Sequence, residues 1–236
     1  MRDLDAFLSA AAVEPAVHAL RPDYRAMLIA VDGIEPGPSD DGSEALLTAA
    51  EDRARRWTDQ TPVDQLPHVA AWRDAYRAFG AKPQRTRNSV EALIRRATGG
   101  LPRVNRLTDI YNAVSVLHQL PLGGEDLDSY SGAPLLVRAT GNEPFHTVTD
   151  GTRTLEHPDP GEVIWCDEAG VTCRRWNWRQ GRRTQLHNGS EAVLFILDAL
   201  DPMTNDELAA AADSLTTHVT RLGPQVRIAR RMMTQA

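Results

Sequence analysis

The chain contains a short apolar run at Arg25-Ala26-Met27-Leu28-Ile29-Ala30-Val31. A run of this length without polar interruption is typical of a buried strand. A second run of the same kind lies far along the chain at Ala192-Val193-Leu194-Phe195-Ile196-Leu197-Asp198. Runs of branched and apolar residues bounded by Gly, Pro, Asp and Asn predict further strands at Leu135–Ala139, Glu162–Asp167 and Val171–Trp176.

Segments with helical periodicity surround these runs. They predict helices in the opening segment, at about 43–57, at 67–79, after the N-cap pair Asn88 and Glu91, at about 106–118, and after the capping box of Thr204 and Glu207. Because helices bracket a sheet, we expect an α+β (mixed α/β) fold. We expect an N-terminal helix-strand-helix segment (1–66), a core domain (67–203) and a C-terminal helix and tail (204–236), packed as one unit.

The composition excludes several classes of protein. Of the 236 residues, 42% are hydrophobic and 25% are charged, which is typical of a globular domain and excludes a disordered or fibrous chain. No apolar stretch approaches the length of about 18 residues that a membrane span needs, and residues 1–15 lack the pattern of a signal peptide. Two cysteines, Cys166 and Cys173, are too few for a secreted disulfide scaffold, so we expect a cytoplasmic protein with no membrane partner.

Common metal and nucleotide motifs are missing from the sequence. It has no paired histidines, no Cys-x-x-Cys, no phosphate-binding glycine loop and no nucleophile elbow, so we expect neither a metal nor a cofactor. Cys166 and Cys173 could face each other across a hairpin, most simply as two packed thiols and otherwise as a metal clip or redox pair.

Basic residues are clustered although the net charge is −6. One cluster lies in the loop that leads to the helix after Asn88, and it consists of Lys82, Arg85, Arg87 and Asn88 itself. A helix N-terminus offers free N–H groups and partial positive charge, so this loop is a candidate phosphate site; a solvated basic loop is the alternative.

A polar stripe marks the helix predicted at 106–118. Asn105, Asp109 and Asn112 stand at i, i+4 and i+7 on an otherwise apolar helix. Such a stripe could hold a ligand, or it could bond the neighbouring backbone.

The most basic segment runs from Arg174 to Arg183 and has five arginines and no acid. On a strand, alternation would place Arg175, Asn177 and Arg179 on one face and Arg174, Trp176 and Trp178 on the other. Arginine for phosphate and tryptophan for base stacking suit a single-stranded RNA end. The alternative is a pair of core tryptophans covered by arginines. We also assign Gln180 and Arg182 to the RNA-binding set.

Several motifs follow one another along the chain. They are Tyr76-Arg77-Ala78-Phe79-Gly80-Ala81-Lys82-Pro83, Arg87-Asn88-Ser89-Val90-Glu91-Ala92-Leu93, Leu101-Pro102 with Asn105, Asp109 and Asn112, Asp126-Leu127-Asp128, and Arg174-Arg175-Trp176-Asn177-Trp178-Arg179-Gln180. Between Trp72 and Ala199 this order resembles the free-standing B3/B4 domain proteins, which are related to the editing module of the phenylalanyl-tRNA synthetase beta subunit.

The resemblance implies a B3/B4-like sheet flanked by helices, with helical N- and C-terminal extensions. In the synthetase the module hydrolyses tyrosine wrongly attached to its tRNA, so the implied partner is a tRNA or aminoacyl-tRNA 3′ end, not DNA. The implied activity is hydrolysis in trans, without ligase activity. Where the synthetase module often has a histidine this chain has Gly123, so tyrosine specificity is not implied.

For such a reaction we predict a water held by Asn105, Asp109 and Asn112 or by backbone groups. Arg175 and Asn177 would complete the catalytic set, with an arginine or N–H groups stabilising the oxyanion. The three polar clusters should then converge on one cleft. Two other functions remain open: a non-catalytic module that binds an RNA end or aminoacyl ligand, and a small-molecule hydrolase or sensor with the same fold.

Overall fold

A computed structural model describes residues 2–149 and 151–235 of the chain. It has an α+β fold, which confirms the predicted fold class. The helices are α1 Leu4–Ser9, α2 Pro15–Leu20, α3 Asp41–Thr58, α4 Pro67–Ala78, α5 Ser89–Ala97, α6 Arg106–Leu117 and α7 Asn205–Val219. The strands are β1 Ala12–Val13, β2 Arg25–Asp32, β3 Leu122–Asp126, β4 Leu135–Arg138, β5 Phe145–Thr149, β6 Thr152–Glu156, β7 Val163–Asp167, β8 Gly170–Arg174, β9 Arg179–Gln180, β10 Ala192–Ala199 and β11 Arg227–Met233.

A four-stranded antiparallel sheet forms the centre of the fold, in the order β11-β2-β10-β3. The two long apolar runs, β2 and β10, are its inner strands and pair along their whole length, from Ala192 opposite Asp32 to Ala199 opposite Arg25. Burial on both faces explains why neither run alternates with polar residues. The prediction of two buried strands is confirmed.

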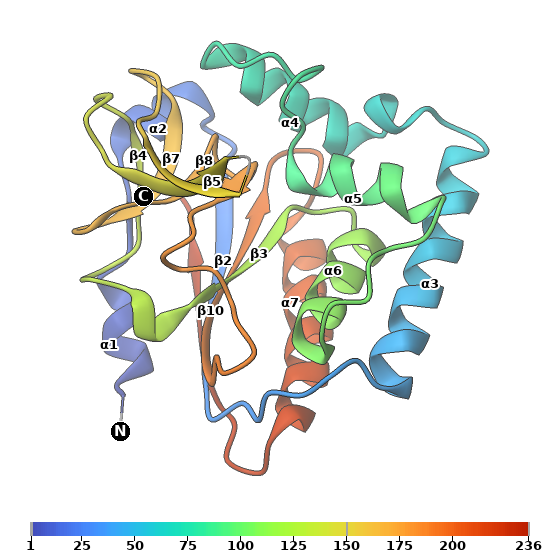
Figure 1. Cartoon of the computed structure of the whole chain (residues 1–236). Coiled ribbons are helices and arrows are strands. Elements are labelled where there is room, and N and C mark those ends of the chain that lie inside the picture. Colours follow the sequence, from blue (N-terminus) through green and yellow to red (C-terminus); the bar gives the residue numbers. More distant parts are fainter. Residues whose placement is uncertain (1, 150, 236) are drawn as a thin grey trace.

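The two faces of this sheet are covered by different layers (Figure 1). One face packs against α6 and α7 through Met27, Ile29, Val31, Val193, Phe195 and Leu197. The other face carries Ala26, Leu28, Ala30, Leu194 and Ile196, and it packs against Trp72 and Tyr76 of α4 and against Val163 and Trp165 of a second sheet.

The second sheet has the order β1-β4-β7-β8-β9, and β5 and β6 form a separate hairpin. Across the β7–β8 pair, Trp165 lies opposite Cys173 and Cys166 lies opposite Val171, with a bulge between Trp165 and Cys166. Cys166 belongs to one hydrophobic cluster and Cys173 packs against another. The prediction of two thiols packed together is therefore wrong, because the bulge and the alternation of the strand separate them.

The helices begin where the capping residues predict. The Asn88 side chain accepts a hydrogen bond from the Glu91 N–H at 2.8 Å and starts α5. Thr204 and Glu207 form the predicted capping box at the start of α7. The Glu91 carboxylate bonds the guanidinium groups of Arg73 and Arg95, so α5 is tied to α4 by a buried ion pair. None of the described helices is long and apolar enough to cross a membrane.

Candidate functional site

A cavity of about 290 Å³ is lined by residues of the edge strand β3, of β10, α5 and α6, and of the segment after β8. Figure 1 labels these helices and strands. On β3 and β10, Gly123 lies opposite Ile196, and Glu125 lies opposite Leu194. Side chains at alternate positions share a face, so Gly123, Glu125, Ile196 and Asp198 all point to the cavity side of the sheet. The remaining lining residues are Ser89, Ala92, Leu93, Tyr111, Asn112, Leu122, Gly124, Trp165, Cys173, Trp176, Asn177, Trp178 and Gln180.

The two glycines of β3 shape this cavity. A Cβ at Gly123 would meet no atom within 4 Å, so its missing side chain leaves open space. A Cβ at Gly124 would approach Leu186 to 3.0 Å and Phe195 to 3.2 Å, so glycine there allows close packing on the other face. Gly123 is therefore the position at which a side chain would most directly fill the cavity.

Trp176 and its neighbours form a tight turn, and the strand predicted to continue to Trp176 ends at Arg174. Arg175 and Trp176 have φ angles of 48° and 67°, in the left-handed region that non-glycine residues rarely adopt. Trp176 is fully buried and packs edge-on against Tyr24 and Trp72, with ring centroids 5.0 and 5.3 Å away. The predicted alternation of Arg175, Asn177 and Arg179 against Arg174, Trp176 and Trp178 is therefore wrong, because burial of one indole reverses the chain.

The buried Glu162 and the partly exposed Glu156 hold the arginines of this turn. The Arg174 guanidinium makes a two-pronged pair with Glu162, with N–O distances of 2.9 and 2.7 Å, and also bonds Glu156 at 3.1 Å. Arg175 stacks on the Trp178 ring at 4.5 Å and lies 3.5 Å from Glu162. Arg174 is buried and its donors are occupied within the protein, which contradicts its predicted contact with RNA.

Arg179 and Gln180 also bond within the protein. Arg179 pairs with Glu156 at 3.5 Å and donates to the Val148 carbonyl at 3.2 Å. The Gln180 amide donates to the carbonyls of Gly124 and Thr184, which ties the turn to β3. Gln180 nevertheless lines the cavity, together with Trp176 and Trp178.

Asn177 is the link between the turn and the central sheet. Its carbonyl oxygen accepts from the Tyr76 hydroxyl at 2.9 Å, and its amide nitrogen donates to Asp198 at 3.2 Å. Asp198 also accepts from the Tyr24 hydroxyl at 2.7 Å. Burial raises the pKa of Asp198 to about 7, so this carboxyl can exchange a proton near neutral pH.

Polar side chains gather in the same cavity. The half-buried Asn112 amide lines the cavity, and the buried Ser89 hydroxyl has no hydrogen-bond partner among the described residues. One carboxyl oxygen of Glu125 accepts from the Tyr130 hydroxyl, and the Thr172 side chain lies beside the same carboxyl. Polar side chains that can bond a ligand therefore converge on this cavity, and one of them, Ser89, is buried without a partner.

The stripe on α6 does not act as a unit. Asn105 is the N-cap, outside the helix, and its side chain accepts from the Thr108 N–H at 2.8 Å. Asp109 is fully buried; its carboxylate accepts from the Val104 N–H at 2.8 Å and from the Ser39 hydroxyl. Only Asn112 lines the cavity. The predicted single stripe is wrong, because the helix begins one residue after Asn105 and the cap turns that side chain back on the helix end.

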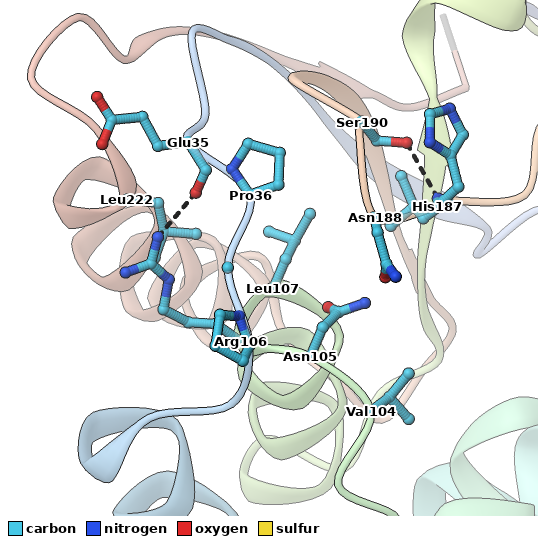
Figure 2. A pocket seen from close by; sticks show the side chains of 13 residues that line it. Glu35, Pro36, Val104, Asn105, Arg106, Leu107, His187, Asn188, Ser190 and Leu222 are labelled. Atoms are coloured by element: carbon cyan, nitrogen blue, oxygen red, sulfur yellow. Dashed lines mark hydrogen bonds between the residues drawn. The ribbon is translucent and has the colours of Figure 1, made fainter.

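Asn105 instead faces a second hollow of about 370 Å³ (Figure 2). There the amides of Asn105 and Asn188 lie near each other, beside His187. Both the His187 ring, at 3.1 Å, and the Ser190 hydroxyl contact Asp126. The Ser190 hydroxyl also accepts from the His187 backbone N–H at 3.1 Å (Figure 2). Because the hydroxyl meets the backbone of His187 and donates to the acid, with the ring bonded to the acid as well, this cluster is not arranged as a nucleophilic triad.

No residue of the loop from Lys82 to Asn88 lines the cavity; the next residue, Ser89, does. Lys82 and Arg85 line a separate hollow beside Asp159 and Arg175. Arg87 is exposed, and the buried Asn88 side chain is used as a helix cap. Arg182 lies in another hollow, with His146 and Arg153. The three polar clusters therefore meet only in part.

The sequence reasoning missed three groups in the cavity: Ser89, Glu125 and Asp198. Asp198 carried a signal, since a lone acid at the end of an apolar strand is unusual. Glu125 lies on β3, and the two adjacent glycines of this strand remove the apolar pattern from which a strand is predicted. Within the described residues, no group of three or more His, Cys, Asp or Glu side chains could hold a metal ion.

The sequence pattern of the B3/4 domain matches residues 71–223. This chain belongs to the B3/4 domain family. The matched range contains every residue that lines the 290 Å³ cavity of this B3/4 domain protein. The resemblance found in the sequence motifs is thereby confirmed at the level of the family.

No curated protein matches the chain in sequence. Among solved structures, an N-terminal fragment of the phenylalanyl-tRNA synthetase beta subunit from Pyrococcus horikoshii is similar, with 9% identity and a TM-score of 0.47. The alignment covers 96% of this chain and 54% of that fragment, so the chain spans about half the fragment's length.

Proposed function

We propose that this protein binds the 3′ end of a misacylated tRNA and hydrolyses the ester between the amino acid and the terminal ribose. The observation that carries the proposal is the cavity with its polar side chains, in a B3/4 domain whose motifs resemble an editing module. Its volume of about 290 Å³ is at the lower end of ligand pockets, roughly 300–1,000 Å³, and suits one aminoacyl group.

Asn112 and Asn177 are the predicted catalytic residues that line the cavity, and the proposal keeps these two. The Asn112 amide and the Ser89 hydroxyl would donate hydrogen bonds to the ester carbonyl oxygen as it gains charge. Asn177 would act by holding Asp198 in place, since its amide bonds that carboxylate.

Asp198 would be the base, because a carboxyl with a pKa of about 7 is well matched to proton transfer at neutral pH. A water attacks the carbonyl carbon and gives one proton to Asp198. The bond from that carbon to the ribose oxygen then breaks, and the ribose oxygen takes up a proton. The products are the free amino acid and the uncharged tRNA.

The tRNA backbone would be held by basic side chains that are free to bind phosphate. Lys82, Arg85 and Arg182 are exposed and form no ion pair with any described residue, so we assign them this role. Arg174 and Arg179 are left out because carboxylates of the protein already pair with them.

The test is a deacylation screen of the purified protein against a panel of mischarged tRNAs. We expect amino-acid release, with turnover, from at least one of them, and a loss of release in Gly123→Leu, which fills the cavity, and in Asp198→Asn. Salt-sensitive tRNA binding without release would identify a binding module. If the protein neither binds tRNA nor releases an amino acid, the proposal is overturned.

A further inference from the structure

Glu125 is a buried acid that faces the cavity. Its side chain is 3% exposed, and it points to the cavity side of β3 together with Gly123. One carboxyl oxygen accepts from the Tyr130 hydroxyl, and the Thr172 side chain lies beside the same carboxyl. The other carboxyl oxygen is reachable from the cavity, so a ligand that donates a hydrogen bond there can bind it.

Among the described residues, Arg183 is the cation that faces this acid, and it is shared with other groups. The titratable or charged groups that face Glu125 are Tyr130 after β3, Cys173 on β8, Asp167 on β7 and Arg183 in the loop after β9. Arg183 is committed to other partners, since it bonds Asp167 and the Ser129 carbonyl. Burial accordingly raises the pKa of Glu125 to about 7, and a cationic ligand group would favour its charged form.

The walls around Glu125 also suit a cation. The indole rings of Trp165 and Trp176 and the ring of Tyr111 line the same cavity, whereas the Trp178 ring already stacks on Arg175. Aromatic faces attract cations, most strongly when water is excluded. A purely apolar ligand would use these walls but offer no donor to Glu125.

We infer that Glu125 binds the α-ammonium group of the aminoacyl moiety, so that the cavity admits esters with a free α-amino group and excludes N-acylated ones. The inference rests on the proposed function, because the α-ammonium is the one cation that all aminoacyl esters share. Along the strand direction, Glu125 and Asp198 are four residues apart, roughly 13 Å. This spacing accommodates the ammonium, the carbonyl carbon and a water in sequence, each in a contact of about 3 Å.

The test uses three non-hydrolysable probes that differ only at the α position: 3′-(L-alanylamino)-3′-deoxyadenosine, its N-acetyl derivative and its lactyl counterpart with an α-hydroxyl. Calorimetry at pH 7 should show the alanyl probe binding at least about tenfold more tightly than the other two, as a charge-assisted hydrogen bond implies. Glu125→Gln should remove this preference and leave the affinities of the two neutral probes within about twofold. Glu191→Gln, the same change at an exposed position, is the matched control.

Equal binding of all three probes to the unmodified protein would overturn the role of Glu125 and leave an aminoacyl site in place. Hydrolysis of N-acetylaminoacyl-tRNA as fast as of aminoacyl-tRNA would do the same. Binding of no probe would overturn the inference together with the proposed function. The probe binding and the hydrolysis of the two esters are both compared on the unmodified protein, so the inference stays testable even if Glu125→Gln does not fold.

Discussion

Asp109→Asn is expected to destabilise the fold while leaving each folded molecule able to bind and react. Asp109 is fully buried in the first turn of α6, and its two oxygens accept from the Val104 N–H and the Ser39 hydroxyl. Replacing each of the two charge-assisted hydrogen bonds by a neutral one costs about 1 kcal/mol, and loss of the anion at a helix N-terminus costs about 0.5 kcal/mol. The sum, about 2.5 kcal/mol, lowers the Tm of a chain of this length by about 5–10 °C.

The assay is thermal and urea unfolding, with single-turnover deacylation and probe binding measured on the same preparation. Asp206→Asn is the matched control, because Asp206 is an exposed acid in the first turn of α7. It should report the helix-end contribution alone, less than about 1 kcal/mol. An unchanged Tm with lost turnover would refute the structural role and place Asp109 in the chemistry.

Four further outcomes are expected. Gly123→Leu should keep the Tm within about 3 °C, because the space is open, yet weaken binding of the alanyl probe more than about tenfold; equal affinity would show that the ligand binds elsewhere. Because burial raises the pKa of Asp198 to about 7, the folded state holds a proton that the unfolded state releases above about pH 4. The free energy of unfolding should therefore fall as the pH rises from about 4 to 7, by at most about 4 kcal/mol for this group. Asp198→Asn should flatten this dependence of stability on pH, as measured by urea unfolding. Arg182→Ala should reduce the slope of log affinity for tRNA against log salt by about one, and an unchanged slope would remove it from the phosphate contacts. Glu162→Ala leaves Arg174 without its main buried partner and should cost about 3–5 kcal/mol in chemical unfolding; a cost below about 1 kcal/mol would mean that the pair does not hold the turn.

Features that depend on neighbouring residues could be read from the sequence. The caps at Asn88 and Thr204 were predictable because a side chain and an N–H three residues ahead decide them. The buried strands β2 and β10 were predictable because burial on both faces removes all polar residues from a run. Strands with glycines or mixed polarity, such as β3, lack this signal and take their conformation from their partners.

The composition of the cavity depended on contacts between distant segments. The segment from Arg174 to Gln180 reads as an RNA-binding strand, since nothing nearby reveals that Glu162 and Glu156 neutralise its arginines. Likewise, the α6 stripe reads as one surface until the position of the helix start separates Asn105 from Asn112.

The sequence by itself determined the family, the α+β class, the buried strands and most helix starts, because local periodicity, caps and ordered motifs carry that information. Only the tertiary structure decided which polar groups line the cavity. Glu125 and Asp198 face it because β3 pairs with β10 in one register, and Asn177 joins them because burial of Trp176 reverses the chain. Pairing register and the burial of a single indole depend on residues far apart in the sequence, so no local pattern records them.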